Sequence, residues 1–271
     1  MKATIHYTFS RVSYRQRASI FSAGAIAIVA ACILMGFDPA MLFTEFHFVI
    51  DLLKSMAPPN YQLLWNDKTI GMAILETLSM AFLGTLIGGC VAMLLAFLAA
   101  ANTMPFRGVR VLVRVLLSFQ RVIPSLFIIL IFVAAVGLGP FAGMLTLVLS
   151  TVGTFGQLFT EIIENSDPAP ADAIYAAGAT RWQVIRYAIL PQILPSFTAN
   201  LFYAYDINIR TAIGLGIFGG GGIGFQLFQA MRLLHYRDAL ALICLTVLLI
   251  VLTEKISDAL RAQLLGAGAL K

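Results

Sequence analysis

The class of fold is decided by an uncharged stretch from residue 122 to residue 160, which reads VIPSLFIILIFVAAVGLGPFAGMLTLVLSTVGTFGQLFT. A membrane-spanning helix needs about 20 mostly apolar residues, because hydrocarbon leaves an open backbone without hydrogen-bond partners. The stretch is too long for one crossing, and its segment Gly137-Leu138-Gly139-Pro140 indicates a tight turn. It therefore predicts two consecutive transmembrane helices.

Other apolar stretches predict four more spans, over residues 18–36, 71–101, 188–216 and 239–258. None of them alternates polar and apolar residues as the strands of a membrane barrel do. The composition agrees, since 60% of the residues are hydrophobic and 11% are charged, whereas a soluble domain carries roughly 25% charged residues. We expect an all-α membrane protein with six transmembrane helices.

The distribution of lysine and arginine predicts the orientation. One side of the membrane has 13 of these residues and the other has 4, with Arg210 inside a span. Both termini should therefore be cytoplasmic. The first apolar stretch resembles a signal peptide, but it is long for one and lacks a convincing cleavage site before Asp38, so a retained helix is expected.

The expected domains follow from these spans. In the outer part of the second domain, residues 43–56 should form either an interfacial helix or a plain loop. The domains are a cytoplasmic tail (1–17), the first helix with an extracytoplasmic segment (18–70), a core (71–262) and a second cytoplasmic tail (263–271).

A polar segment, residues 165–190, separates the fourth and fifth spans. Ser166-Asp167-Pro168 supplies a cap and a proline for a helix start, and Gly178 is a natural terminator. The segment is either an ordinary helical loop or a docking surface for a groove in another protein. Small residues give it the low profile that docking requires: Ala173, Ala176, Ala177 and Gly178.

A second short helix should follow in the same segment. Thr180 and Gln183 have the spacing of a capping box, and the helix should run to Leu190. Pro191 and Pro195 are then expected to disturb the entry into the next span.

The segment resembles the coupling loop of ABC importer permeases, whose motif is Glu-Ala-Ala, three residues, Gly, nine residues, Ile, one residue, Leu-Pro. Asp172-Ala173-Ile174, Gly178 and Leu190-Pro191 have this spacing, with departures at Asp172, Ile174 and Ala188. The resemblance implies a type I importer permease fold in which this loop docks into a cytoplasmic ATPase. It also implies that ATP and magnesium bind to that partner, while this chain is not an enzyme and binds no cofactor.

Motifs of other function classes are absent or out of context. The chain has no Gly-x-x-x-x-Gly-Lys-Ser/Thr phosphate loop, and residues 214–219 match a dinucleotide fingerprint but follow a span rather than a β-strand. His6, His47 and His235 are scattered, so no metal site is expected. The basic residues do not cluster with exposed aromatic residues, which argues against nucleic acid as a partner.

The fifth predicted span contains Asp206, Asn208 and Arg210. An ionisable residue inside a span costs roughly 2.5–3.5 kcal/mol unless it faces protein or a wet cavity. Asp206 and Arg210 are four residues apart and can pair on one helix face. They either neutralise each other between packed helices, or Arg210 and Asn208 line a pathway for an anion while Asp206 holds the arginine.

Residues 205–212 and 219–224, which read YDINIRTA and GGGGIG, resemble the signature of phosphonate-type importer permeases. Residues 132–143 and Glu76-Thr77-Leu78 are also similar to that family, and the resemblance covers about residues 71–261. It implies transport of phosphonate, phosphite or phosphate across the bacterial cytoplasmic membrane. The implied partners are a second permease subunit (the same chain or a paralogue), two ABC ATPase subunits, an extracytoplasmic phosphonate-binding protein and membrane lipid.

The glycine cluster has two interpretations. Backbone N–H groups in such a turn can form an anion-binding nest, but glycines more often permit close packing or a sharp turn, which we favour. Glu76 is a further candidate for the translocation pathway, although its position near the outer end of a span also suits an interfacial residue. The cluster comprises Gly219, Gly220, Gly221, Gly222 and Gly224.

Two alternatives to an oxyanion importer stay open. The chain could be an ABC permease for another small solute, such as methionine. It could also be a secondary transporter driven by an ion gradient, which would predict inverted repeats and a midplane ion site. No convincing internal repeat is found in the sequence.

Overall fold

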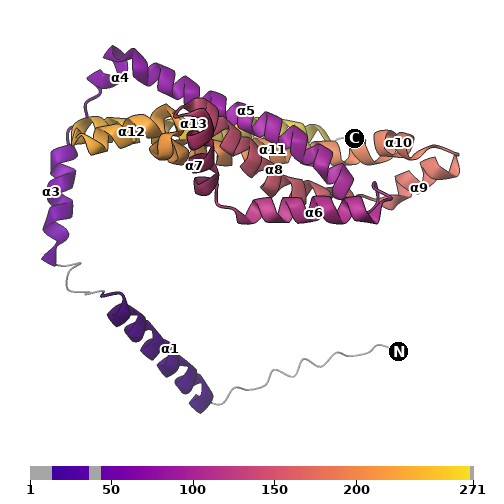
Figure 1. Ribbon diagram of the computed structural model, residues 1–271, viewed down its shortest axis with the longest axis horizontal. Helices are drawn as coiled ribbons and strands as arrows, with labels where there is room; N and C mark the ends of the chain where they lie inside the picture. The colour runs from indigo at the N-terminus through magenta and orange to yellow at the C-terminus, as the bar shows by residue number, and fades with distance from the viewer. Residues whose placement is uncertain (1–13, 37–43, 269–271) are drawn as a thin grey trace. The chain divides into compact units, whose positions relative to one another are not determined.

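The computed structural model describes residues 14–36 and 44–268, and the chain forms two compact units, residues 1–55 and 56–271 (Figure 1). All regular elements in the described residues are helices, which confirms the all-α prediction. The first unit contains α1 (Tyr14–Leu34) and most of α3 (Phe46–Met56). The second contains α4 (Gln62–Asn66), α5 (Lys68–Ala99), α6 (Arg107–Val122), α7 (Ser125–Val136), α8 (Pro140–Glu164), α9 (Pro168–Ala176), α10 (Arg181–Val184), α11 (Leu190–Leu215), α12 (Gly222–Arg232) and α13 (Tyr236–Gly268), with π-helical turns at Ile185–Ile189 and Gly216–Gly220.

The segment 43–56 was expected to be an interfacial helix or a loop. It is helical over Phe46–Met56, and Phe43 lies outside the described residues. At 100° per residue the apolar side chains of α3 fall on one face. The opposite face carries His47, Asp51, Lys54 and Ser55.

Three helices of the second unit, α5, α8 and α13, are long and apolar enough to cross a membrane. Two bent pairs pass the same test jointly: α6 with α7, bent by 92°, and the helix from Arg181 to Gly220 with α12, bent by 55°. Length and composition therefore give three spans, or up to five if each bent pair crosses once. In α1 the described apolar helix is the shorter Ser19–Leu34. The structure confirms several apolar helices of spanning length, but not the number six.

The third predicted span differs most from the structure. It retains only α7, whose 12 residues extend about 18 Å, whereas the hydrocarbon core is about 30 Å thick. Pro124 separates α7 from α6 because the residue before a proline avoids the helical conformation, and Ile123 is indeed extended (φ −76°, ψ 117°).

The arginines between residues 107 and 121, expected in a connection between spans, lie on α6. Val113 and Leu117 are buried on this helix. The arginines between them and around them make the segment polar overall, so the sequence does not show its apolar face clearly. Arg114 pairs with Glu164 at the end of α8, and its Nε donates to the carbonyl oxygen of Ala99 at the end of α5 (2.9 Å). Arg114 therefore ties α6 to the neighbouring helix ends.

The start of α5 is set by Asp67, whose carboxylate accepts a hydrogen bond from the backbone N–H of Thr69 (2.9 Å). This is the N-cap arrangement that satisfies an otherwise unpaired helical N–H. The hydrogen bonds of Thr69, from its side chain first and its backbone second, lower the pKa of the Asp67 carboxyl below its ordinary value.

Glycines bring α5 close to α8. A Cβ atom on Gly88 would lie 2.7 Å from the Cβ of Thr151 and 2.9 Å from the carbonyl oxygen of Val148, so only glycine fits there. Gly84 and Gly88 form the small-x-x-x-small pattern that allows helix backbones to approach in membranes. The approach brings Thr85 of α5 and Thr151 of α8 within reach of the same residue of α11.

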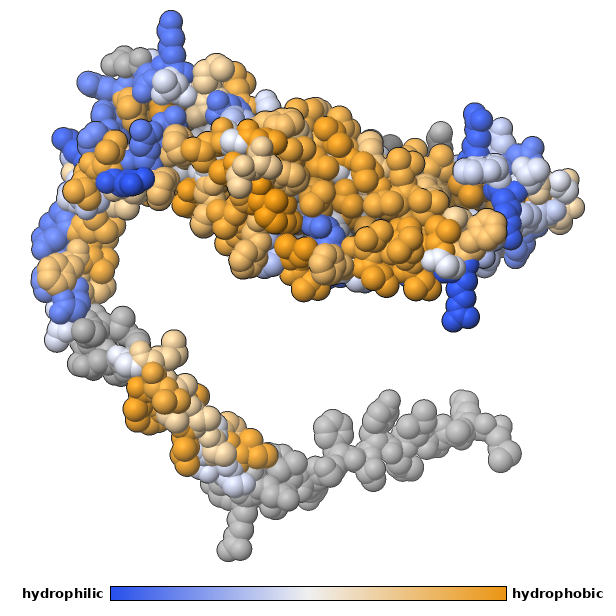
Figure 2. Space-filling model, in the orientation of Figure 1, coloured by the Kyte–Doolittle hydropathy of each residue, from blue (hydrophilic) through white to orange (hydrophobic). Residues whose placement is uncertain are grey.

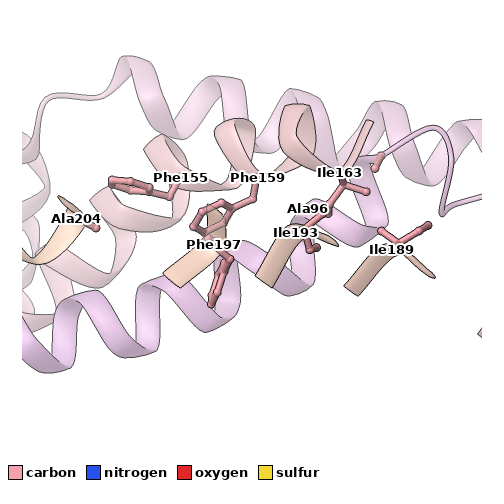
Figure 3. Packing of buried hydrophobic residues seen from close by; sticks show 10 residues of the cluster. Ala96, Phe155, Phe159, Ile163, Ile189, Ile193, Phe197 and Ala204 are labelled. Atoms are coloured by element: carbon pink, nitrogen blue, oxygen red, sulfur yellow. The ribbon is translucent and has the colours of Figure 1, made fainter. Parts of the chain in front are cut away.

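A buried apolar cluster joins α5, α8 and α11 (Figure 3). The rings of Phe159 and Phe197 lie 4.7 Å apart, and Ile189 extends the cluster into the π-helical turn. Helices α9 and α10 lie at one end of the second unit, and α4 and α12 lie at the other (Figure 1). The visible surface of this unit is hydrophobic across the middle and hydrophilic toward both ends, as a membrane-crossing body requires (Figure 2).

Candidate functional site

The segment resembling a coupling loop forms two helices joined by a tight turn. Asp167 caps α9, accepting a hydrogen bond from the N–H of Ala169 (3.0 Å). The predicted terminator, Gly178, has φ +83° and donates its N–H to the carbonyl oxygen of Tyr175 (2.9 Å). A left-handed glycine of this kind is a common helix ending. Both local predictions are confirmed.

The second helix starts as predicted and continues further. Thr180 and Gln183 form the capping box, with the Thr180 N–H donating to Gln183 Oε1 (2.7 Å). The expected disturbance at Pro191 and Pro195 is a π-helical turn rather than a break, so the helix runs without interruption through α11. The wider turn, Ile185–Ile189, directly precedes α11, whose second residue is Pro191.

The loop presents small and aromatic side chains to its surroundings. No residue of α9 is buried, and Asp172, Ala173, Ala176, Ala177 and Gly178 are all exposed or partly exposed, while Leu190 is half-buried and Pro191 exposed at the start of α11. A Cβ on Gly178 would meet no atom within 4 Å. Trp182, which was not predicted as a site residue, is 80% exposed. Large aromatic residues are typical anchors of protein interfaces. The position of Trp182 close to Gly178 was therefore the signal by which the sequence could have identified it as a site residue.

Asn208 of α11 lies in a polar cluster halfway along the packed helices. Its side chain is buried, and its Nδ2 donates to Thr85 Oγ1 (2.8 Å) and to Thr151 Oγ1 (2.9 Å). These bonds satisfy a buried amide that would otherwise be costly in this environment. The geometry makes Asn208 a tie between α5, α8 and α11, and its predicted contact with substrate stays a prediction.

Asp206 and Arg210 lie on a different face of α11 from Asn208 and form the predicted ion pair, with Nη2 3.0 Å from Oδ2. The same Nη2 also lies 3.0 Å from Oε2 of Glu254 on α13. Glu254 was not among the predicted site residues, although an acid inside the last predicted span was a usable signal. The three side chains form a charged cluster that the fold brings together from two helices.

The glycine cluster forms the kinked connection between α11 and α12. Gly219, Gly221 and Gly222 have positive φ values of 94°, 75° and 69°, and a Cβ on Gly221 would lie 2.9 Å from Cδ of Pro140. The connection is also bonded to the turn before α8, since the N–H of Gly139 donates to the carbonyl oxygen of Gly219 (2.8 Å). Close packing against that turn therefore requires glycine here.

Glu76 occupies the N-terminus of α12. Its Oε2 accepts a hydrogen bond from the N–H of Gly222 (2.9 Å), and Thr77 Oγ1 accepts one from the N–H of Ile223 (3.0 Å). The first N–H groups of a helix lack intrahelical partners and attract negative charge. The anion held at this glycine turn is thus a carboxylate of the same chain, and a pathway role for Glu76 stays a prediction.

Replacement of Glu76 by alanine should lower thermal stability, since loss of a cap costs about 0.5–2 kcal/mol. Glu76→Gln should retain most of the stability because an amide oxygen still accepts the bond. Thermal unfolding of the purified chain in detergent measures both, with Glu45→Ala, an exposed carboxylate in the first unit, as the control. Unchanged stability together with lost transport would instead favour the pathway role.

Among the described residues, no three His, Cys, Asp or Glu side chains are grouped so as to hold a metal ion.

The chain is similar to known proteins in sequence and in fold. Residues 92–264 match the family described as binding-protein-dependent transport system inner membrane component. The phosphate-import permease protein PhnE of Mycolicibacterium smegmatis is 37% identical over 248 residues, which are 92% of this chain and 44% of that protein. This chain thus spans less than half the length of that relative. The phosphite transport system permease protein PtxC of Stutzerimonas stutzeri is 35% identical over 88% of each chain.

Among solved structures, a chain of the inward-facing MetNI methionine ABC transporter superposes with a TM-score of 0.64. The alignment covers 76% of this chain and 99% of the other, at 16% sequence identity. At that identity the likeness shows a shared fold.

Proposed function

Because this chain belongs to the family of binding-protein-dependent transport system inner membrane components and is the permease component of an ABC importer, we propose that it moves a phosphorus oxyanion across the bacterial cytoplasmic membrane. Phosphonate, phosphite and phosphate are the candidates. Relatives at 35–37% identity are named for phosphate and phosphite transport.

The observation that carries the proposal is Arg210. Its guanidinium is on α11, two residues beyond Asn208, and about half of its side chain is exposed (48%). A planar guanidinium can give two parallel hydrogen bonds to a phosphoryl group, and such charge-assisted pairs are strong. A half-exposed cation within a helix that crosses the membrane suits a pathway for an anion.

A second permease subunit, identical or paralogous, should cover the face that carries Arg210 and Glu254. Exposed charges within a membrane-crossing helix are too costly against lipid and require protein or water. The translocation pathway then runs between the two subunits. We place the chain's six spans, including α1, with both termini in the cytoplasm, and we place α3 in the outer membrane interface with its apolar face in lipid.

Two cytoplasmic ATPase subunits should dock on α9, Gly178 and α10, and an extracytoplasmic binding protein should deliver the anion. ATP and magnesium bind in those ATPase subunits. Closure of the ATPases moves the loop, the continuous helix through α11 carries the movement to Arg210, and the anion is released inward.

The test is ATPase activity in proteoliposomes that hold this chain with the ATPase encoded beside it and its binding protein. Methylphosphonate, phosphite, phosphate and methionine are added in turn. One phosphorus oxyanion should raise the ATPase rate about tenfold or more. This corresponds to a lowering of the activation barrier for ATP hydrolysis by at least about 1.4 kcal/mol. Stimulation by methionine alone would contradict the substrate assignment, and gradient-driven uptake without any ATPase would contradict the importer.

A further inference from the structure

Glu254 changes what Arg210 can do. One nitrogen atom, Nη2 of Arg210, lies 3.0 Å from a carboxylate oxygen of Asp206 and 3.0 Å from one of Glu254. With both acids ionised, the three side chains carry a net charge of −1. A dianion that approaches this cluster meets an arginine that is already paired and a carboxylate that repels it.

The two carboxylates are held differently. Asp206 is on the same helix as Arg210, four residues earlier, and its side chain is 12% exposed, so it stays beside the guanidinium. Glu254 is on α13, its side chain is 49% exposed, and its only ion pair or hydrogen bond in the described residues is the one with Arg210. Glu254 is therefore free to turn away while Asp206 is not.

Arg210 also keeps unused hydrogen-bond donors. Arginine has five N–H groups, and within the described part of the chain only those on Nη2 have partners. The N–H groups on Nε and Nη1 remain available to an anion. A phosphoryl group could first bind these donors and then compete for Nη2.

Resting on the proposed function, we propose that Glu254 is an internal competitor of the transported oxyanion. In the absence of substrate its carboxylate pairs with Arg210. The phosphoryl group displaces it, while Asp206 keeps the guanidinium in place. A ligand displaces Glu254 only if it binds the guanidinium more tightly than the Glu254 carboxylate does. Glu254 therefore makes the site selective for multiply charged oxyanions over chloride.

The charge of Glu254 is removed, with its size kept, in Glu254→Gln. Inorganic phosphate, phosphite and methylphosphonate are each titrated onto the purified permease–ATPase complex without binding protein. Glu254→Gln should bind the oxyanion about tenfold tighter or more, since it removes a like charge next to the ligand. Asp258→Asn is the matched control, because this acid lies one turn further along α13 and pairs with Arg261 at 3.4 Å; its affinity should equal that of the wild type.

An affinity of Glu254→Gln equal to or weaker than that of the wild type would overturn the inference. If Glu254→Gln fails to assemble, the inference is tested with the double variant Arg210→Glu/Glu254→Arg, which exchanges the two charges. Assembly without oxyanion binding supports the inference, whereas restored transport would make the pair a structural clamp. A wild-type complex that binds methionine and none of the three oxyanions would overturn the proposed function itself, which is a different result from unchanged affinity in Glu254→Gln.

Discussion

Replacement of Gly178 by tryptophan should abolish uptake and substrate-stimulated ATPase activity while the chain still folds. Gly178 lies at the tip of the loop with φ +83°, and a Cβ there would meet no atom within 4 Å. A tryptophan side chain would therefore project outward, into the space that the ATPase should occupy. Loss of docking by about tenfold or more corresponds to at least about 1.4 kcal/mol of binding free energy.

Two controls separate the clash from backbone strain. Gly178→Ala imposes the same left-handed strain, about 1–2 kcal/mol, with little bulk, and it should retain most activity. Gly36→Trp places the same side chain at another open glycine, with φ +65° and no atom within 4 Å of its Cβ, and should leave coupling intact. Normal assembly and stimulated ATPase activity in Gly178→Trp would refute the docking role.

Substitution of Arg210 by lysine should reduce oxyanion uptake by about tenfold or more, because an ammonium group lacks the planar fork that binds two phosphoryl oxygens. The positive charge persists between Asp206 and Glu254, so assembly should remain near that of the wild type. Initial uptake rates in proteoliposomes and the yield of assembled complex measure the two effects.

Arg210→Ala should have the larger effect. It removes the cation from between two carboxylates, which leaves like charges facing each other between α11 and α13 and weakens assembly as well as transport. The comparison of lysine with alanine therefore divides the role of Arg210 between substrate contact and ion pairing. Uptake at the wild-type rate in Arg210→Lys would assign the residue to ion pairing alone.

The sequence predicts well whatever depends on neighbours along the chain. The all-helical class follows from the apolar runs, and the two short helices around Gly178 follow from the caps at Asp167 and Thr180. The pair of Asp206 with Arg210 follows from helical spacing. In each case the residues that decide the structure lie within one or two turns of one another.

The remaining features depend on contacts between distant segments. Glu254 joins Arg210 across 44 positions, and Glu76 reaches Gly222 across 146. No local pattern links such residues in a single sequence. Helix α6 was missed because its stability comes from Val113 and Leu117 packing on neighbouring helices, while its arginines make the segment look like a loop.

The unbroken helix from Arg181 to Arg210 fixes both the distance and the rotation between the loop and the charged cluster. It spans about 44 Å, and each added residue rotates the rest of the helix by about 100°. One residue inserted between Phe197 and Asp206 would rotate the Asp206–Arg210 face away from Glu254 and misalign Asn208 with its two threonine partners. A deletion would do the same in the opposite sense. The number of residues between the loop and the charged cluster is therefore fixed by geometry, even at positions where many residue types would fit.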